Sequence, residues 1–169
     1  MWLNFWVAIL TVAVIGAVSL LVLAAPRRPR VPQVAFLLVA GFLLANKVFS
    51  PQYVLWLIPL AVLARPRWRA FLAWQAAEVA VLLSRFYFFV GNDRPGQGAP
   101  IEVFFAAVLA RDLALVVLMA FVVRDVLRPD RDVVRATGTD DPAGGVLDGA
   151  PDRWTRPASA RTATAAASA

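Results

Sequence analysis

The sequence predicts an all-α integral membrane protein, a helix bundle with about five membrane segments and a disordered C-terminal tail. Hydrophobic residues make up 60% of the 169 residues, charged residues only 17%, and mean hydropathy is +0.68. An average soluble domain carries about 25% charged residues. The arginines gather in short clusters at the ends of apolar runs, which is typical of transmembrane topology rather than of a nucleic-acid groove.

The composition also limits the chemistry. The net charge is +6, and 17 residues are basic, of which only Lys47 is a lysine. Cysteine and histidine are both absent. Disulfides, thiolate nucleophiles, histidine bases and Cys/His zinc sites are therefore excluded, and we expect no cofactor, no metal and no nucleic-acid partner.

Apolar runs define a transmembrane domain over residues 1–135. The first run, Trp2 to Ala25, is longer than the about 20 residues that a crossing needs. No positive charge precedes it, as a secretory signal would require, so we expect it to stay in the membrane. The expected spans are 2–25, 31–46, 52–64, 70–90 and 101–123.

The basic residues orient these spans. If the arginine clusters face the cytoplasm, only Lys47 and Arg94 are left on the other side, and this asymmetry favours a cytoplasmic C-terminus. We therefore expect a multi-pass protein of the plasma membrane. Ten arginines fall on the predicted cytoplasmic side: Arg27, Arg28, Arg30, Arg65, Arg67, Arg69, Arg124, Arg128, Arg131 and Arg135.

The segment between PRRPR and RPRWR must turn round near NKVFSPQY, which predicts a hairpin. Its arms, 31–45 and 53–64, would be about 22 Å and 18 Å long as helices, against about 30 Å of hydrocarbon. Hence the turn should lie below the outer surface. Irregular backbone at that depth needs protein or a water-filled cavity around it, and such broken segments often carry binding sites.

The turn has the chemistry of an anion site. Ser50 is placed as an N-cap and Pro51 fits the first turn of the second arm. The amides of Gln52 and Tyr53, with the cation of Lys47 nearby, would suit a phosphate. The alternative is that Ser-Pro simply starts a helix while Lys47 reaches the head groups.

Charged residues also lie inside the two long helices. Each costs about 2.5 to 3.5 kcal/mol at a helix centre on insertion scales, so each should face protein and find a partner. Glu78 with Arg111 is the preferred structural ion pair, since antiparallel helices bring their depths within about 5 Å. Arg85 would approach Asp112 or point into an outward cavity, where it could contact a lipid phosphate or a sugar.

Other polar groups give weaker signals. Asp93 and Glu102 are acids predicted outside, without a convincing partner. Asp130 and Asp132 have a spacing that some metal sites use, but the surrounding arginines favour a solvated segment that contacts head groups. From 136 to 169 the chain is rich in Ala, Gly, Pro, Thr and Ser, and we expect a disordered cytoplasmic tail.

Several of these stretches resemble a known family. NKVFSPQYVLWLIPLAVLA, RPRWRAFLAWQAAEVAVLL and RDLALVVLMAFVVRDVLRPDRDVVR are similar to the C-terminal portion of actinobacterial membrane proteins of glycosyltransferase family 87, in the GT-C superfamily. The resemblance covers about residues 31–135, and SPQY and WQAAE are its most specific parts.

The resemblance implies an enzyme that moves a sugar, usually mannose, from a polyprenyl phosphate carrier to a lipid or glycan acceptor on the extracytoplasmic face. By analogy Lys47, Ser50, Gln52 and Tyr53 would line the pocket for the carrier phosphate or the sugar. The family's catalytic acid lies near the N-terminus of a longer chain, so the catalytic residues are unknown here. We expect the chain to correspond to the last part of such an enzyme and to be inactive alone.

Two functions therefore remain open. The chain could be the membrane part of a glycosyltransferase that uses a polyprenyl-phosphate sugar. It could instead be a small non-enzymatic scaffold or accessory subunit, which associates with membrane lipids and with another membrane subunit through Glu78 or Arg111.

Overall fold

A computed structural model describes residues 2–46, 51–93 and 98–152, and within these ranges the chain forms helices and turns without a strand. The all-helical class that the sequence predicts is therefore confirmed. Five α-helices are present in the described ranges: α1 (Trp2–Ala24), α2 (Val31–Ala45), α3 (Val54–Ala64), α4 (Trp68–Asp93) and α5 (Ile101–Leu127).

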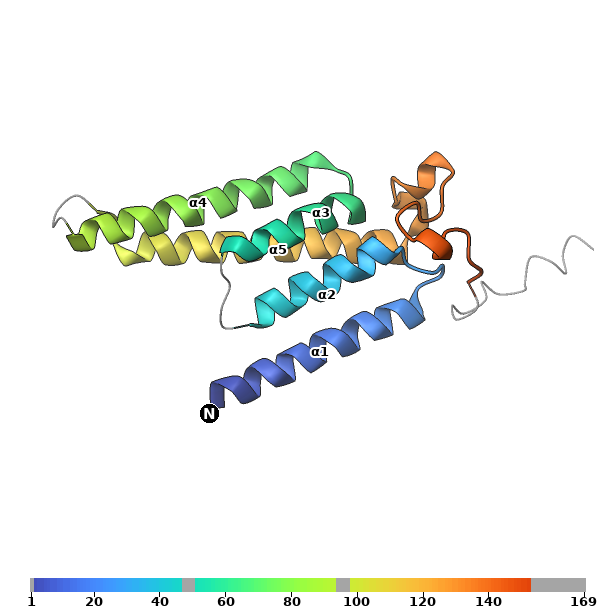
Figure 1. Ribbon diagram of the computed structural model, residues 1–169, viewed down its shortest axis with the longest axis horizontal. Coiled ribbons are helices and arrows are strands. Elements are labelled where there is room, and N and C mark those ends of the chain that lie inside the picture. The colour runs from blue at the N-terminus through green and yellow to red at the C-terminus, as the bar shows by residue number, and fades with distance from the viewer. Residues whose placement is uncertain (1, 47–50, 94–97, 153–169) are drawn as a thin grey trace, which may run out of the picture.

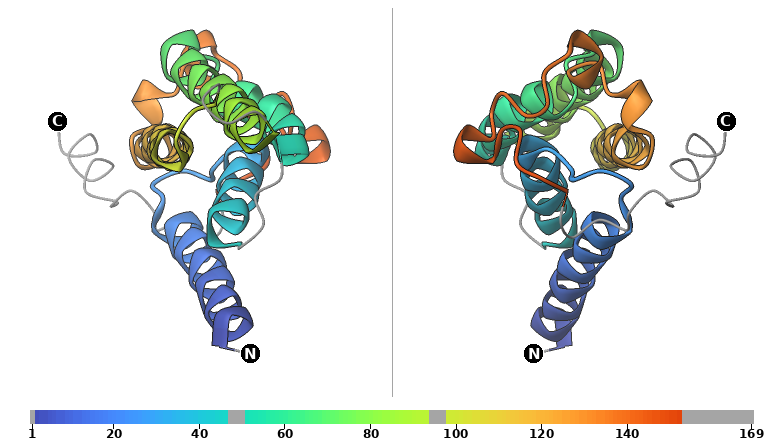
Figure 2. Two further views of the ribbon diagram at one scale, coloured as in Figure 1. Left: turned by 90° about the vertical axis from the view of Figure 1, so that its left-hand side faces the viewer. Right: turned by 90° about the vertical axis from the view of Figure 1, so that its right-hand side faces the viewer.

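Two antiparallel pairs organise the bundle (Figure 1). α4 and α5 lie side by side along the long axis, and α2 and α3 form the predicted hairpin against them. An end-on view shows α2 to α5 grouped together, while α1 packs outside α2 and leans away (Figure 2). The core between the four grouped helices includes Phe36, Leu57, Trp74, Leu115 and Leu118.

Length and apolar composition qualify two of these helices, α1 and α5, as able to cross a membrane. α2 and α3 are apolar but shorter, with 15 and 11 residues. α4 has 26 residues, but Gln75, Glu78, Ser84 and Arg85 interrupt its apolar sequence. The predicted helices are thus present, and two of them have the character of membrane spans.

Large apolar side chains cover much of the outer surface. They include Trp2, Phe5, Trp6, Leu109 and Leu113, each more than half exposed. A soluble monomer rarely exposes contiguous apolar surface of this extent. This surface indicates membrane association.

α1 is held against α2 by a close contact at Gly41. A Cβ atom built on Gly41 would lie only 2.5 Å from Cγ1 of Val14. The absence of a side chain at position 41 therefore lets the two helices approach.

The segments that carry the arginine clusters, 26–30, 65–69 and 124–135, meet at one end of the bundle (Figure 1). A buried ion pair between distant residues, Arg30 and Asp132, lies at this end. Arg30 donates from Nε and Nη2 to Asp132, at 2.7 and 3.1 Å, and both side chains are buried. Gln33 donates to the same carboxylate at 3.0 Å. The prediction that Asp132 is solvated was therefore wrong, because the carboxylate neutralises a buried guanidinium.

A second group of ion pairs joins Arg65, at the end of α3, and Arg124 to the carboxylate of Asp125. Nε of Arg65 donates to Oδ2 of Asp125 at 2.9 Å, and Nη2 of Arg124 donates to Oδ1 at 2.9 Å. The guanidinium of Arg65 also lies 4.6 Å above the ring centroid of Phe121. The ends of α3 and α5 are joined by these contacts.

The chain after α5 continues as 3-10 turns, η2 (Pro129–Arg131), η3 (Arg135–Thr137) and η4 (Gly145–Leu147). The carboxylate of Asp141 accepts the backbone N–H of Val31 at 2.8 Å and so caps α2. Asp140 pairs with Arg28 and Arg135, at 2.8 and 3.0 Å. Residues 136–152 thus differ from the predicted disordered tail, because their aspartates bind the arginine end. The rest of that tail, 153–169, lies outside the described residues.

Candidate functional site: a polar pocket between α2, α4 and α5

A pocket forms because the hairpin is shorter than the helices beside it. α4 and α5 are about 39 and 40 Å long, and α2 is about 22 Å long at 1.5 Å per residue. α2 therefore ends alongside the middle of α4 and α5 (Figure 1). The halves of α4 and α5 that lie away from the arginine end enclose a space beyond the end of α2.

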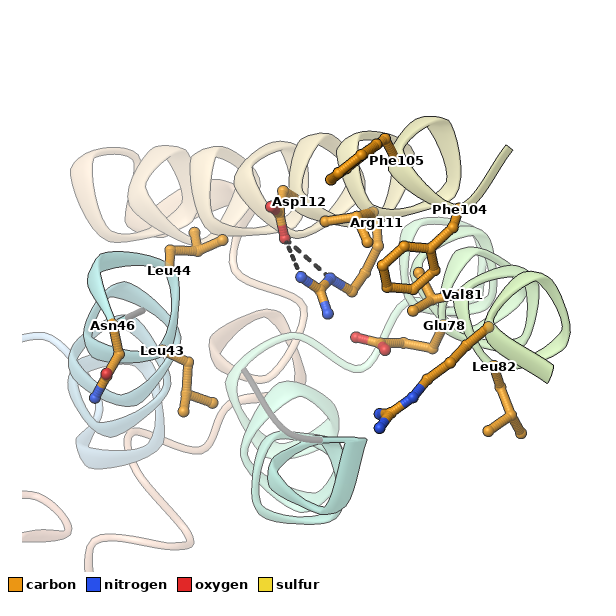
Figure 3. A pocket seen from close by; sticks show the side chains of 12 residues that line it. Leu43, Leu44, Asn46, Glu78, Val81, Leu82, Phe104, Phe105, Arg111 and Asp112 are labelled. Atoms are coloured by element: carbon orange, nitrogen blue, oxygen red, sulfur yellow. Dashed lines mark hydrogen bonds and ion pairs between the residues drawn. The ribbon is translucent and has the colours of Figure 1, made fainter. Parts of the chain in front are cut away.

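This space is a pocket of about 340 Å³ with a mixed lining (Figure 3). Leu43, Leu44 and Asn46 come from the end of α2, and Phe104 and Phe105 from α5. The charged lining residues are Glu78, Arg85, Arg111 and Asp112. The four charged residues that the sequence singled out within the apolar helices are thus brought to one pocket.

Arg111 and Asp112 form the ion pair of this pocket. Nη2 and Nε of Arg111 lie 2.8 and 2.9 Å from Oδ1 of Asp112. The Arg111 side chain is buried, while that of Asp112 is about one-third exposed, at 37%. The carboxylate of Asp112 therefore neutralises Arg111 while remaining partly open to a ligand.

Glu78 lies across the pocket on α4, and its side chain points toward Arg111 (Figure 3). Its Oε1 accepts a hydrogen bond from Nε1 of Trp74 at 3.0 Å. Trp74 is completely buried, so this bond fixes the direction of the Glu78 carboxylate. Glu78 and Arg111, the expected pair, line the same pocket, and Arg111 also forms an ion pair with Asp112.

Arg85 is an exposed residue of α4 and lines the pocket. Its guanidinium lies 5.8 Å from the ring centroid of Phe89, one turn further along the helix. Arg85 was expected to approach Asp112 or to point into a cavity, and the two residues line the same pocket. The guanidinium therefore stands at the rim of a pocket whose inner cation, Arg111, already has a carboxylate partner.

The turn residues that were expected to bind the phosphate or the sugar are not among the described residues that line this pocket. Gln52 and Tyr53 belong to η1 (Pro51–Tyr53), which precedes α3, and the described lining of the pocket does not include them. Gln52 is exposed, and the Tyr53 ring packs on Trp56 with centroids 5.0 Å apart. Lys47 and Ser50 lie outside the described residues.

Sequence reasoning missed two residues of this site. These are Asn46, which was placed only within the NKVFSPQY turn, and Trp74, which was given no role of its own. The spacing of Trp74 and Glu78, four residues apart on one helix, was the signal that could have identified the buried hydrogen bond.

The arrangement suits the binding of a small polar group rather than a metal. Within the described ranges there is no cluster of three or more Asp, Glu, His or Cys side chains that could hold a metal ion. Two guanidiniums can donate hydrogen bonds to a phosphate, and two carboxylates can accept them from hydroxyl groups.

Comparison with protein-family models, with curated proteins and with solved structures gives no match to this chain. The function is therefore argued from the pocket and its surroundings.

Proposed function

We propose that this chain is a multi-pass membrane protein whose pocket binds the head of a polyprenyl-phosphate sugar, as the membrane part of a glycosyltransferase similar to family 87. The observation that carries the proposal is the convergence of Arg85 and Arg111 with Glu78 and Asp112 in one pocket, beside apolar surface.

The charged residues of the pocket would bind different parts of the head group. The planar guanidinium of Arg85, exposed at the rim, would take the phosphate through charge-assisted hydrogen bonds. The carboxylates of Glu78 and Asp112 would accept hydrogen bonds from sugar hydroxyls. Phe104 and Phe105 supply apolar surface against which a sugar ring can pack.

An apolar groove adjoins the pocket and supports a lipid-linked ligand. Leu44 lines both the polar pocket and a groove of about 610 Å³ between α1, α2 and α5. The groove is lined mainly by aliphatic side chains, among them Leu10, Val116 and Met119. The isoprenoid chain would lie in this groove while its phosphate reaches the arginines.

The topology that we propose has five membrane segments and a cytoplasmic C-terminus. It is supported by the gathering of the arginine clusters at one end of the bundle, which the positive-inside rule would put in the cytoplasm (Figure 1). The residues that line the pocket lie on the middle of α4 and α5 and on the half of each helix remote from these arginines. The pocket would then face the extracytoplasmic side, where lipid-linked sugars of this class are used according to the resemblance.

Binding is the step that we assign to this chain. Mannose as the sugar, and a lipid or glycan as the acceptor, follow from the resemblance alone. The residue that activates the acceptor is left unassigned, and another segment or subunit would supply it.

The proposal is tested by ligand binding to the purified chain in phosphatidylcholine nanodiscs, with native mass spectrometry as the readout. The ligands are a polyprenyl phosphate mannose, the bare polyprenyl phosphate and the uncharged polyprenol. We expect Arg85→Gln to raise the Kd of both phosphates about tenfold, since one charge-assisted hydrogen bond contributes about 1.5 to 3 kcal/mol. Glu78→Gln should reduce the preference for the mannosylated ligand over the bare phosphate.

The matched control is Arg27→Gln, which removes an exposed arginine at the other end of the bundle. It should leave all three affinities unchanged. Equal weakening by Arg85→Gln and Arg27→Gln, or polyprenol binding as tightly as its phosphate, would exclude the pocket as the head-group site.

A further inference from the structure

A second groove lies at the arginine end of the bundle, on the outer face shared by α4 and α5. It is open, with a volume of about 1010 Å³, and its lining differs from that of the polar pocket. Arg65, Arg67, Arg69 and Arg124 stand at one end of it. The rest of its lining consists of small and aliphatic side chains together with the aromatic rings of Trp68 and Phe121.

The groove forms where small alanine side chains of α4 and α5 face its interior. Ala110, Ala114 and Val117 line it from α5, and these positions fall on one stripe of a helix with 3.6 residues per turn. Ala70 and Ala73 line it from α4. Because alanine projects only a methyl group, the two helices leave a channel between their outer surfaces.

The channel has the length of a lipid chain. From Ala110 to Arg124 the groove follows α5 for about 21 Å at 1.5 Å per residue. One leaflet contributes about 15 Å of hydrocarbon, half of a typical bilayer core. An acyl chain could therefore lie along the alanines over the whole depth of a leaflet.

The arginine end carries excess positive charge. Arg65 and Arg124 share the single carboxylate of Asp125. Arg67 and Arg69 are both exposed, and Arg67 donates only a long hydrogen bond, at 3.4 Å, to the backbone oxygen of Arg131 among the contacts described for it. An anion at this end would thus meet at least two guanidiniums, Arg67 and Arg69, for which no carboxylate partner is found among the described residues.

We propose that this groove binds an anionic phospholipid. Its phosphate lies between Arg67 and Arg69, and one acyl chain lies along the alanines of α4 and α5. Trp68, exposed at the same end, suits the interface between head groups and hydrocarbon, where tryptophan is enriched. The proposal depends on membrane association but not on sugar transfer, since it uses none of the residues of the polar pocket.

Charge complementarity also argues against a second copy of this chain as the occupant. Copies inserted in one orientation hold their arginine clusters at the same depth. A neighbouring copy in the groove would therefore bring arginines to arginines, and like charges at close range repel. An anionic head group brings the opposite charge to the same place.

The test uses the full chain in nanodiscs of phosphatidylcholine with a small fraction of phosphatidylglycerol, and counts the lipids retained after gentle delipidation by native mass spectrometry. We expect retained phosphatidylglycerol to exceed retained phosphatidylcholine at least tenfold relative to the supplied mixture. The double variant Arg67→Gln/Arg69→Gln should lose most of this preference. Soluble glycerol phosphate should not compete, because it lacks the acyl chain.

Two matched controls separate a site from general attraction. Arg27→Gln/Arg128→Gln removes the same charge from exposed positions at the same end, outside the groove, and should keep the preference. Ala73→Phe fills the groove and should lower phosphatidylglycerol retention, whereas Ala76→Phe, exposed on α4 outside the lining, should not.

Equal losses in the two arginine double variants would overturn the proposal, since they would indicate surface attraction only. So would equal retention of the two phospholipids by the unmodified chain. A change in oligomeric mass with Ala73→Phe, measured in the same spectra, would also overturn it by identifying a protein helix as the occupant.

Discussion

Arg30 and Asp132 are 102 residues apart in the chain and form a two-bond ion pair at the arginine end of the bundle. Their side chains are only 1% and 3% exposed. Arg30 also donates to the backbone oxygens of Leu63 and Ala64, at 2.9 and 2.7 Å, and so satisfies carbonyls at the end of α3. A single guanidinium thus connects the start of α2, the end of α3 and the segment after α5.

Asp132→Asn is expected to destabilise the protein by about 3 to 5 kcal/mol, because it leaves the buried charge of Arg30 without a counter-charge. The free energy of unfolding would be measured in mixed micelles by circular dichroism. Asp130→Asn is the control, since Asp130 lies two residues away and is exposed, and its effect should stay within about 0.5 kcal/mol. Similar losses in both variants would show that the ion pair does not hold this end together.

The two arginines that share Asp125 should differ in their effects on stability. The Arg65 side chain is 7% exposed and that of Arg124 is 31% exposed. Arg65→Gln removes the buried partner and should cost several times more unfolding free energy than Arg124→Gln, which leaves the buried pair intact. The same unfolding assay measures both variants, and the reverse order would contradict the geometry.

Gly41→Ala should weaken the packing of α1 on α2. The new methyl group would meet Cγ1 of Val14, and a valine in a helix has essentially one χ1 rotamer, so it cannot turn away. We expect an overpacking cost of about 1 to 3 kcal/mol. Gly16→Ala gives the reference, because a Cβ at Gly16 meets no atom within 4 Å and the substitution should gain up to about 1 kcal/mol of helix propensity.

The steric origin of this loss can be checked by adding Val14→Ala to Gly41→Ala. The second substitution removes the clashing methyl groups, so the effects of the two should be far from additive. Strict additivity in the double variant would mean that the two residues do not touch.

Some features of the site could be predicted from particular residues. Glu78, Arg85, Arg111 and Asp112 stood out because charges are costly in apolar helices, and this cost also brings them to one protein-lined pocket. Their partners could not be predicted in the same way. Sequence spacing gives depth along a helix, but side-chain conformations decide which atoms meet. Arg111 and Asp112 are neighbours on α5, and their side chains turn toward each other to form an ion pair.

Contacts at the arginine end of the bundle could not be predicted from the sequence either. Composition predicted a disordered tail from 136, since this segment has few large apolar residues. It could not show that the tail's aspartates reach an arginine cluster more than 100 residues away, as Asp140 reaches Arg28 over 112 residues.

Composition and residue spacing were enough to predict the helical class, the lengths of the apolar segments, the hairpin between the first two arginine clusters and the charged residues that line the pocket. These follow from local physics: hydrophobicity, chain length per residue and the cost of a charge in an apolar segment. Three features became visible only once the helices were packed together: the pocket that the short hairpin leaves beside longer helices, the groove lined by alanines of α4 and α5, and the contact of Arg30 with Asp132. Each of these depends on how separate helices are placed against one another, because an ion pair or a cavity forms between surfaces whose relative rotation and depth no single segment specifies.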